Sequence, residues 1–184
     1  MASIVSVEQI KGLASGSTPN TVTIPTGQKI VGTDEGSIVS PGSVVQVKHA
    51  TYGTLTSTTA ASYVNLCNIQ ITPKSAGSSF FLYANFAWSG RGVLNLFRNS
   101  TQLHTHSSDP YVMWGYSQGA WNNNSMRTMI SVSDYDSPTY TLGDSITYHV
   151  KFRSRGTAAA DGAAINERTE NSTMSNFTIM EIAQ

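Results

Sequence analysis

Two carboxylates, Asp134 and Asp136, are the first residues in this sequence whose spacing could support catalysis. They lie two positions apart in SVSDYDSP, and side chains two apart on an extended strand point to the same face. Glycoside hydrolysis uses a pair of carboxylates in one site. The Ser and Pro residues around them favour a polar turn instead. The sequence contains no G-x-S-x-G, H-E-x-x-H or phosphate-loop motif, so we expect no enzymatic activity.

A second candidate is the pair His104 and His106, which are separated by one threonine. On an extended chain both imidazoles point the same way. If three chains met on a threefold axis, their six imidazoles would suit an octahedral transition-metal site. The alternative is a polar loop with two exposed histidines. No other cofactor or metal site is expected.

The segment from residue 104 to residue 125 concentrates aromatic and amide side chains. Aromatic faces can stack on sugar rings while amides bond hydroxyls, and large aromatics also anchor protein interfaces. The alternative is that these aromatics fill the core or a subunit interface, because Trp114 and Tyr116 alternate as buried strand residues do. The residues of the expected receptor-binding site are Tyr111, Trp114, Tyr116, Trp121, Asn122 and Asn123.

Most of the chain alternates apolar and polar residues with a period of two, starting near Gln46. The alternation is clearest in 80–88, 126–132, 146–152 and 177–180, and turn-forming residues lie between these runs. Short strands at such spacing predict an antiparallel β-sandwich or jelly roll without a long helix. The single cysteine, Cys67, alternates with Ile69 and Ile71 and is predicted to be a small buried hydrophobe.

A different pattern precedes this region in TVTIPTGQKIVGTDEGSIVSPGSVVQV, residues 21–47. Its apolar residues are sparse, and Pro25 and Pro41 favour an edge-type or bulged strand. A segment of this size with so few core residues is not stable alone. We expect three copies to intertwine here and to bury the residues Val22, Ile24, Ile30, Ile38 and Val44.

The sequence resembles small structural proteins of tailed bacteriophages, including phages of cyanobacteria and other aquatic bacteria. The resemblance rests on TIPTGQKIVGTDEGSIVSPGSVVQV, on ITPKSAGSSFFLYANF and on the ending STMSNFTIMEIAQ, and covers about residues 21–184. Proteins of this kind are tail fibres or other virion components. The resemblance implies a homotrimer with an N-terminal attachment region and a C-terminal β-sandwich head.

The composition of the chain argues against some classes of binding partner. The formal net charge is zero, with 11 basic and 11 acidic residues, and charged residues make up 12% of the chain. No basic patch of the kind that nucleic-acid binding needs occurs in the sequence. Low charge fits a surface covered by other subunits, or a solvated Ser/Thr surface. No apolar run is long enough to cross a membrane, and residues 1–13 lack the features of a signal peptide.

Together these features predict an all-β virion protein made in the host cytoplasm. Residues 1–20 are expected to dock on other virion proteins, 21–46 to form the intertwined stalk, and 47–184 to form the head. The head is expected to bind a host surface polysaccharide. One alternative is a capsid-attached head fibre or decoration protein with a structural role. Another, from a different class, is a carbohydrate-binding accessory module of an enzyme.

Overall fold

The computed structural model of the protein describes residues 10, 22–32, 34, 37–104, 114–116, 128–154, 163–165 and 175–184. For residues 89–91, 114–116, 128 and 163–165 this description covers the backbone alone. The chain divides into two compact units, Met1–Thr33 and Asp34–Gln184.

The first unit contains a tight turn. The Gln28 N–H donates to the Pro25 carbonyl over 3.1 Å, and Gly27 has a φ of 85° that glycine adopts without strain. Residues 22–32 are all exposed and contain neither helix nor strand. The expected strand character of residues 21–43 is therefore absent from the part of that range that the structure describes. Within the described part of this range, only Gly42 and Ser43 bond a distant backbone, that of Ala183, and sheet hydrogen bonds require such a partner.

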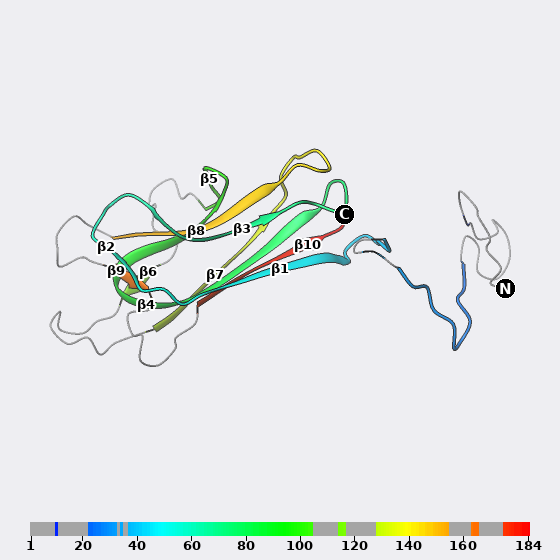
Figure 1. Cartoon of the computed structure of the whole chain (residues 1–184), viewed down its shortest axis with the longest axis horizontal. Helices are drawn as coiled ribbons and strands as arrows, with labels where there is room; N and C mark the ends of the chain where they lie inside the picture. Colours follow the sequence, from blue (N-terminus) through cyan, green and yellow to red (C-terminus); the bar gives the residue numbers. More distant parts are fainter. Residues whose placement is uncertain are drawn as a thin grey trace. The chain divides into compact units, whose positions relative to one another are not determined.

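The described residues of the second unit form ten β-strands and include no helix. Figure 1 shows the strands in their colours along the chain. They are β1 (Val44–Tyr52), β2 (Thr56–Thr58), β3 (Val64–Ile71), β4 (Ser79–Arg98), β5 (Thr101–Gln102), β6 (Trp114–Tyr116), β7 (Thr128–Asp136), β8 (Ile146–Ser154), β9 (Ala163–Ile165) and β10 (Ser175–Ile182).

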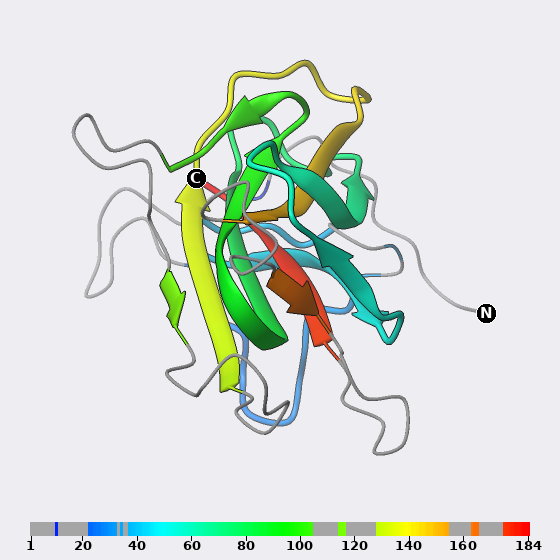
Figure 2. The same ribbon diagram turned by 90° about the vertical axis from the view of Figure 1, so that its left-hand side faces the viewer.

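These strands form two antiparallel sheets that share β4. Sheet A has the order β1-β10-β4-β7, and β9 joins β4 to β2 beside it. Sheet B has the order β3-β8-β4, with β5 and β6 paired to β4 as well. Figure 2 shows β7, β4 and β10 side by side in sheet A. The predicted β-sandwich is thereby confirmed.

Strand β4 passes from one sheet into the other without leaving the extended conformation. Its residues up to Gly90 pair in sheet A, and those from Arg91 onward pair in sheet B. Two glycines, Gly90 and Gly92, flank the point of transfer. Glycine within a strand is typical of sharp bends where a strand changes sheets. The transfer lets one strand line the core with both of its halves.

The core lies between the two sheets and follows the period-two alternation. Phe80, Leu82, Ala84, Phe86 and Trp88 of β4 are all buried, as are Tyr148, Val150 and Phe152 of β8 and Phe177 and Ile179 of β10. The ring of Trp88 packs edge-on against Phe152 across the sandwich, with centroids 6.1 Å apart. Cys67 is partly buried against this core, and burial raises the pKa of its thiol to about 12.

One local expectation is wrong. The predicted turn from Asp134 to Pro138 does not begin at Asp134, because β7 continues as a strand to Asp136 and pairs there with Phe80. Strand β1 begins at Val44 opposite Ile182, and the predicted head boundary at residue 47 stays a prediction. No helix capable of crossing a membrane occurs among the described residues.

Candidate functional site

The outer face of sheet A is an ordered surface built from four strands. Strand pairing aligns its side chains in rows across β1, β10, β4 and β7. One row consists of Val47, Met180, Phe81 and Tyr135; the next of His49, Thr178, Tyr83 and Ser133; and a third of Thr51, Asn176, Asn85 and Ser131. We call these twelve residues, together with Val44 and Ile182 in the next row at one end of the strands and Met129 in the next row at the other, the sheet A face.

No residue of the sheet A face is Lys, Arg, Asp or Glu. Its polar groups bond one another sideways: His49 Nδ1 lies 2.9 Å from Thr178 Oγ1, and Ser131 Oγ donates to Asn85 Oδ1 over 3.2 Å. The Tyr135 hydroxyl accepts a bond of 2.8 Å from the Gln184 amide. Because these particular groups already have partners, covering them would not break their hydrogen bonds.

Exposed apolar side chains concentrate on this face. Seven large hydrophobic residues of 44–184 are exposed in the described part of the chain, and Val44, Val47, Tyr83, Met129 and Tyr135 among them belong to the sheet A face. The other two, Leu55 and Leu142, lie in loops. Scattered exposed apolar residues are ordinary, but a contiguous group on one face is typical of an interaction surface.

The outer face of sheet B has a different character. Along β8, His149, Lys151 and Arg153 point away from the core. The Lys151 ammonium lies 4.4 Å from the centre of the Phe97 ring, a cation–π arrangement. Desolvation and, next, the Lys151 charge lower the pKa of His149, so its ring stays neutral more readily. The two outer faces thus differ in charge although they belong to one sandwich.

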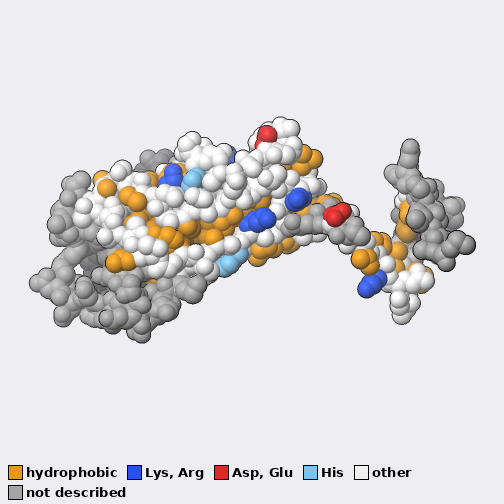
Figure 3. Space-filling model, viewed as in Figure 1, with side chains coloured by type: hydrophobic (Ala, Val, Ile, Leu, Met, Phe, Trp, Pro, Cys, Tyr) orange, Lys and Arg blue, Asp and Glu red, His pale blue; other side chains and the backbone are white. Residues whose placement is uncertain are grey.

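Figure 3 shows the side of the head on which β1 and β3 face the viewer. Hydrophobic side chains form a lengthwise band there, and charged side chains are few and scattered. This view agrees with the low proportion of charged residues in the sequence, 12%.

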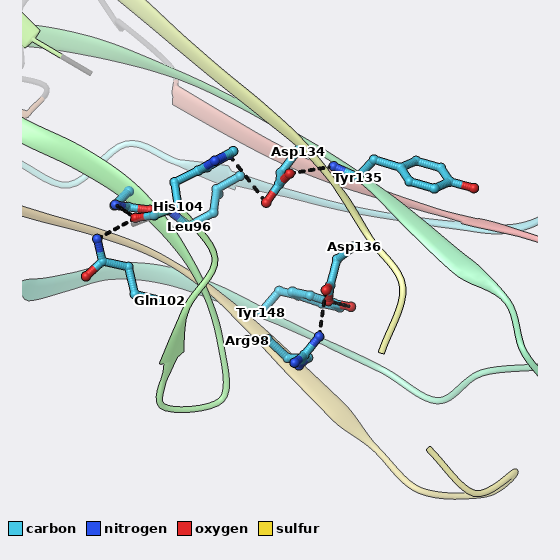
Figure 4. A network of polar contacts seen from close by, with 9 residues as sticks. Leu96, Arg98, Gln102, His104, Asp134, Tyr135, Asp136 and Tyr148 are labelled. Atoms are coloured by element: carbon cyan, nitrogen blue, oxygen red, sulfur yellow. Dashed lines mark hydrogen bonds and ion pairs between the residues drawn. The ribbon is translucent and has the colours of Figure 1, made fainter. Parts of the chain in front are cut away.

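A polar cluster connects the two sheets near the end of β7 (Figure 4). The Arg98 guanidinium donates to Asp136 Oδ1 over 2.6 Å, and the Tyr148 hydroxyl donates to Asp136 Oδ2 over 2.7 Å. Tyr148 is fully buried, and its pKa is raised by desolvation and then by the neighbouring Asp136 carboxylate. The phenol therefore remains protonated and serves as a donor.

The second carboxylate of the pair, Asp134, faces a different partner. Its Oδ2 lies 3.3 Å from His104 Nε2, and its Oδ1 accepts from the Tyr135 N–H over 2.8 Å. Figure 4 shows that Asp134 and Asp136 point to separate partners. Asp136 is thus bonded by two side chains of sheet B, and Asp134 contacts a histidine that follows β5. These contacts hold the end of β7 against the rest of the sandwich.

The expected metal site is only half described, because His106 lies outside the described residues. His104 is held by its carbonyl, which accepts from the Gln102 amide over 2.6 Å and from the Asn95 amide over 3.1 Å. No cluster of three potential metal ligands occurs among the residues that the structure describes. The histidine pair therefore stays a prediction.

A buried carboxylate, Glu181, lies in β10 and pairs with Phe80 of β4, which pairs on its other side with Asp136. It accepts from the Gln46 amide over 2.6 Å, from the backbone N–H groups of Lys74 and Ser75 over 3.0 Å, and from the Ser78 hydroxyl over 2.8 Å. Glu181 is fully buried and points to the core side of its strand. It ties the loop between β3 and β4 to β10.

The expected receptor-binding residues are described only in part. Trp114 and Tyr116 belong to β6, whose backbone pairs with Arg91–Val93 of β4 in sheet B. The other four expected residues, Tyr111, Trp121, Asn122 and Asn123, lie outside the described residues. The aromatic segment thus joins the sandwich beside the point where β4 changes sheets.

The residues expected at the trimer interface are all exposed in the single chain. Val22, Ile24, Ile30, Ile38 and Val44 each expose more than two fifths of their surface. Val44 begins β1 and belongs to the sheet A face, so this residue connects the N-terminal segment to the head surface.

The sheet A face is the feature that sequence reasoning missed. In the sequence, the outward-pointing residues of each strand of this sheet are uncharged. The face could not be predicted from this pattern, because the alternation in one strand does not reveal which strands lie beside it.

A scan against protein-family models and a search of curated proteins both find no match to this sequence.

Proposed function

We propose that this chain is the subunit of a homotrimeric bacteriophage fibre, attached to the virion by its N-terminal region. The head binds a polysaccharide on the host surface. One observation carries the proposal. The N-terminal segment enters the head at one end of the sandwich, and β6 of the aromatic segment joins it at the other.

The first of these ends, the base of the head, is marked by the pairing of Val44 with Ile182 and of Ile182 with Ser79. The Gly42 N–H also donates to the Ala183 carbonyl over 2.8 Å, which fixes the entering chain there. The base therefore holds the start of β1, the start of β4 and the C-terminal residues (Figure 1).

The other end, the tip, is marked by the transfer of β4 between sheets. Trp88 pairs there with Ile165 and Thr128, and Arg91 pairs with Tyr116. Gly90 follows Ser79 by eleven residue steps along extended β4, which corresponds to about 36 Å. A fibre head needs this arrangement, with attachment at one end and recognition at the other.

Trimer formation is supported by the apolar side chains that one chain leaves in water. Val22, Ile24, Ile30 and Val31 are all exposed within the described residues 22–32. Burial of apolar surface stabilises by about 25 cal/mol per Å². The segment gains this only if other chains cover it, and winding with two identical copies would do so. The strand order of the sandwich, in which the chain crosses repeatedly between sheets, favours a jelly-roll head.

Two measurements test this function. Light scattering should give a mass three times the chain mass of 19.7 kDa, and a monomer at micromolar concentration would contradict the trimer. Binding of the assembled protein to host envelope polysaccharide should be detectable by calorimetry. A trimer that joins the particle and binds no host polysaccharide would instead identify a decoration protein with a structural role.

A further inference from the structure

We infer that the sheet A face is the surface through which the heads of identical chains contact one another. The inference rests on the proposed homotrimer and adds to it: the stalk is not the only contact, and the head contributes a defined interface. The occupant of the face is a second copy of this chain.

The first step concerns charge. The sheet A face contains no Lys, Arg, Asp or Glu, whereas the outer face of sheet B carries Lys151 and Arg153. Burying a charged side chain without a partner is costly, so interface centres are depleted in charge. A face without charged side chains cannot form ion pairs with a strongly charged partner. The whole chain is also neutral, with 11 positive and 11 negative residues, so copies do not repel one another through net charge.

The second step concerns hydrogen bonding. A glycan presents many hydroxyl groups and needs free donors and acceptors on the protein. Several polar groups of the sheet A face already bond one another, as His49 bonds Thr178 and Ser131 bonds Asn85. A protein surface of the same kind, apolar between paired polar groups, fits such a face without leaving buried groups unmatched.

The third step concerns continuity along the chain. Ile38 and Val39 are exposed immediately before the base, and Val44 and Val47 follow them on β1. Exposed apolar residues therefore recur along the chain from the entering segment to the start of the sheet A face, all within the unit 34–184. If copies meet along the entering segment, the same approach brings their β1 strands and sheet A faces together.

The area of the sheet A face limits how much this contact can stabilise the assembly. Four strands about 4.8 Å apart and about seven residues of rise, from Val44 to Thr51, give a face of roughly 450 Å² in projection. A stable interface buries roughly 800 Å² per partner. The sheet A face supplies only part of that area, so we expect it to strengthen a trimer that also depends on the N-terminal segment.

The test uses radical footprinting of the full-length protein, with each labelling rate normalised to that of the unfolded chain. Tyr135 and Leu142 are exposed to the same extent in one chain, 52% and 53%, but only Tyr135 lies on the sheet A face. In the assembled protein we expect Tyr135 and Met129 to be labelled at least about five times more slowly than Leu142.

A matched pair of variants tests the same surface by mass. Thr178→Lys places a cation on the central strand β10 of sheet A, and Thr147→Lys places one on the central strand β8 of sheet B. Both threonines are half-buried and point away from the core. Thr178→Lys should raise the concentration at which the assembly dissociates at least about tenfold, and Thr147→Lys should leave it unchanged.

The outcomes separate the two proposals. An assembled wild-type protein whose Tyr135 and Met129 are labelled as fast as Leu142 would overturn the head interface while leaving the fibre trimer intact. A wild-type protein that is monomeric at all concentrations would overturn both. Footprinting of the wild-type chain decides the matter even if Thr178→Lys fails to fold.

Discussion

Replacement of Glu181 is the sharpest test of how the head is held together. This carboxylate is fully buried and accepts hydrogen bonds from four donors. Glu181→Ala would leave the Lys74 and Ser75 N–H groups, the Ser78 hydroxyl and the Gln46 amide facing an empty space. Glu181→Gln keeps the shape of the side chain and replaces one oxygen with an NH₂ group.

The hydrogen-bond geometry predicts different losses of unfolding free energy for the two variants. Oε1 accepts from Lys74, Ser75 and Ser78, and Oε2 accepts from Gln46 and again from Lys74. If the retained oxygen occupies the Oε1 position, Glu181→Gln loses the bond from Gln46 and the second bond from Lys74, whose N–H keeps its bond to Oε1. A hydrogen bond to a charged group contributes about 1.5–3 kcal/mol, so this variant should lose about 2 kcal/mol. Glu181→Ala should lose about 4 kcal/mol or more, because several buried donors lose their acceptor together.

Thermal and urea denaturation followed by circular dichroism would measure these losses, at one protein concentration because assembly shifts the transition. For a chain of this length, 4 kcal/mol corresponds to a fall in Tm of about 8–16 °C. The control is Asp144→Asn, which removes an exposed loop carboxylate and should change stability by about 0.5 kcal/mol at most. A loss below about 1 kcal/mol for Glu181→Ala would refute the role assigned to this residue.

Three further perturbations test other parts of the molecule. Tyr148→Phe removes the donor to Asp136 and should cost about 1.5–3 kcal/mol in urea denaturation, and unchanged stability would contradict the role of that bond. The Cys67 thiol, with its pKa raised to about 12 by burial, should react at pH 8 at least about a hundredfold more slowly in the native chain than in urea; equal rates would disprove its protection. Trp121→Ala should weaken polysaccharide binding about five- to hundredfold without changing the Tm, and a collapsed Tm would place Trp121 in the core or an interface.

The alternation of apolar and polar residues predicted much of the head. The run from Phe80 to Trp88 has its five apolar residues on one buried face, as the period of two required. The runs at 146–152 and 177–180 likewise fall in β8 and β10. Such prediction succeeds because the side chains of a half-buried strand must alternate between core and surface.

Other features could not be predicted from alternation. Glu181 occupies a core-facing position in β10, and a charged residue there is stable only because distant donors such as Ser75 and Ser78 converge on it. The strand character of Asp134 and Asp136 could not be predicted for the same reason, because the side chains that engage them are distant in sequence: Arg98 comes from the sheet B half of β4 and His104 from the residues after β5. Contacts of this kind depend on the arrangement of the sheets, which one strand's sequence does not encode.

A β-bulge near the start of β1 gives the sheet A face its neutral character. Val44 pairs with Ile182 and Gln46 with Glu181, so the register shifts by one residue between them. With strict alternation from Val44, Gln46 and Lys48 would point outward and Val47 would point inward. The bulge reverses this phase: Val47 joins the outer face, Gln46 turns inward to bond Glu181, and Lys48 leaves the face. One inserted residue thus satisfies the buried carboxylate and keeps a charge off the surface through which we propose that the heads meet.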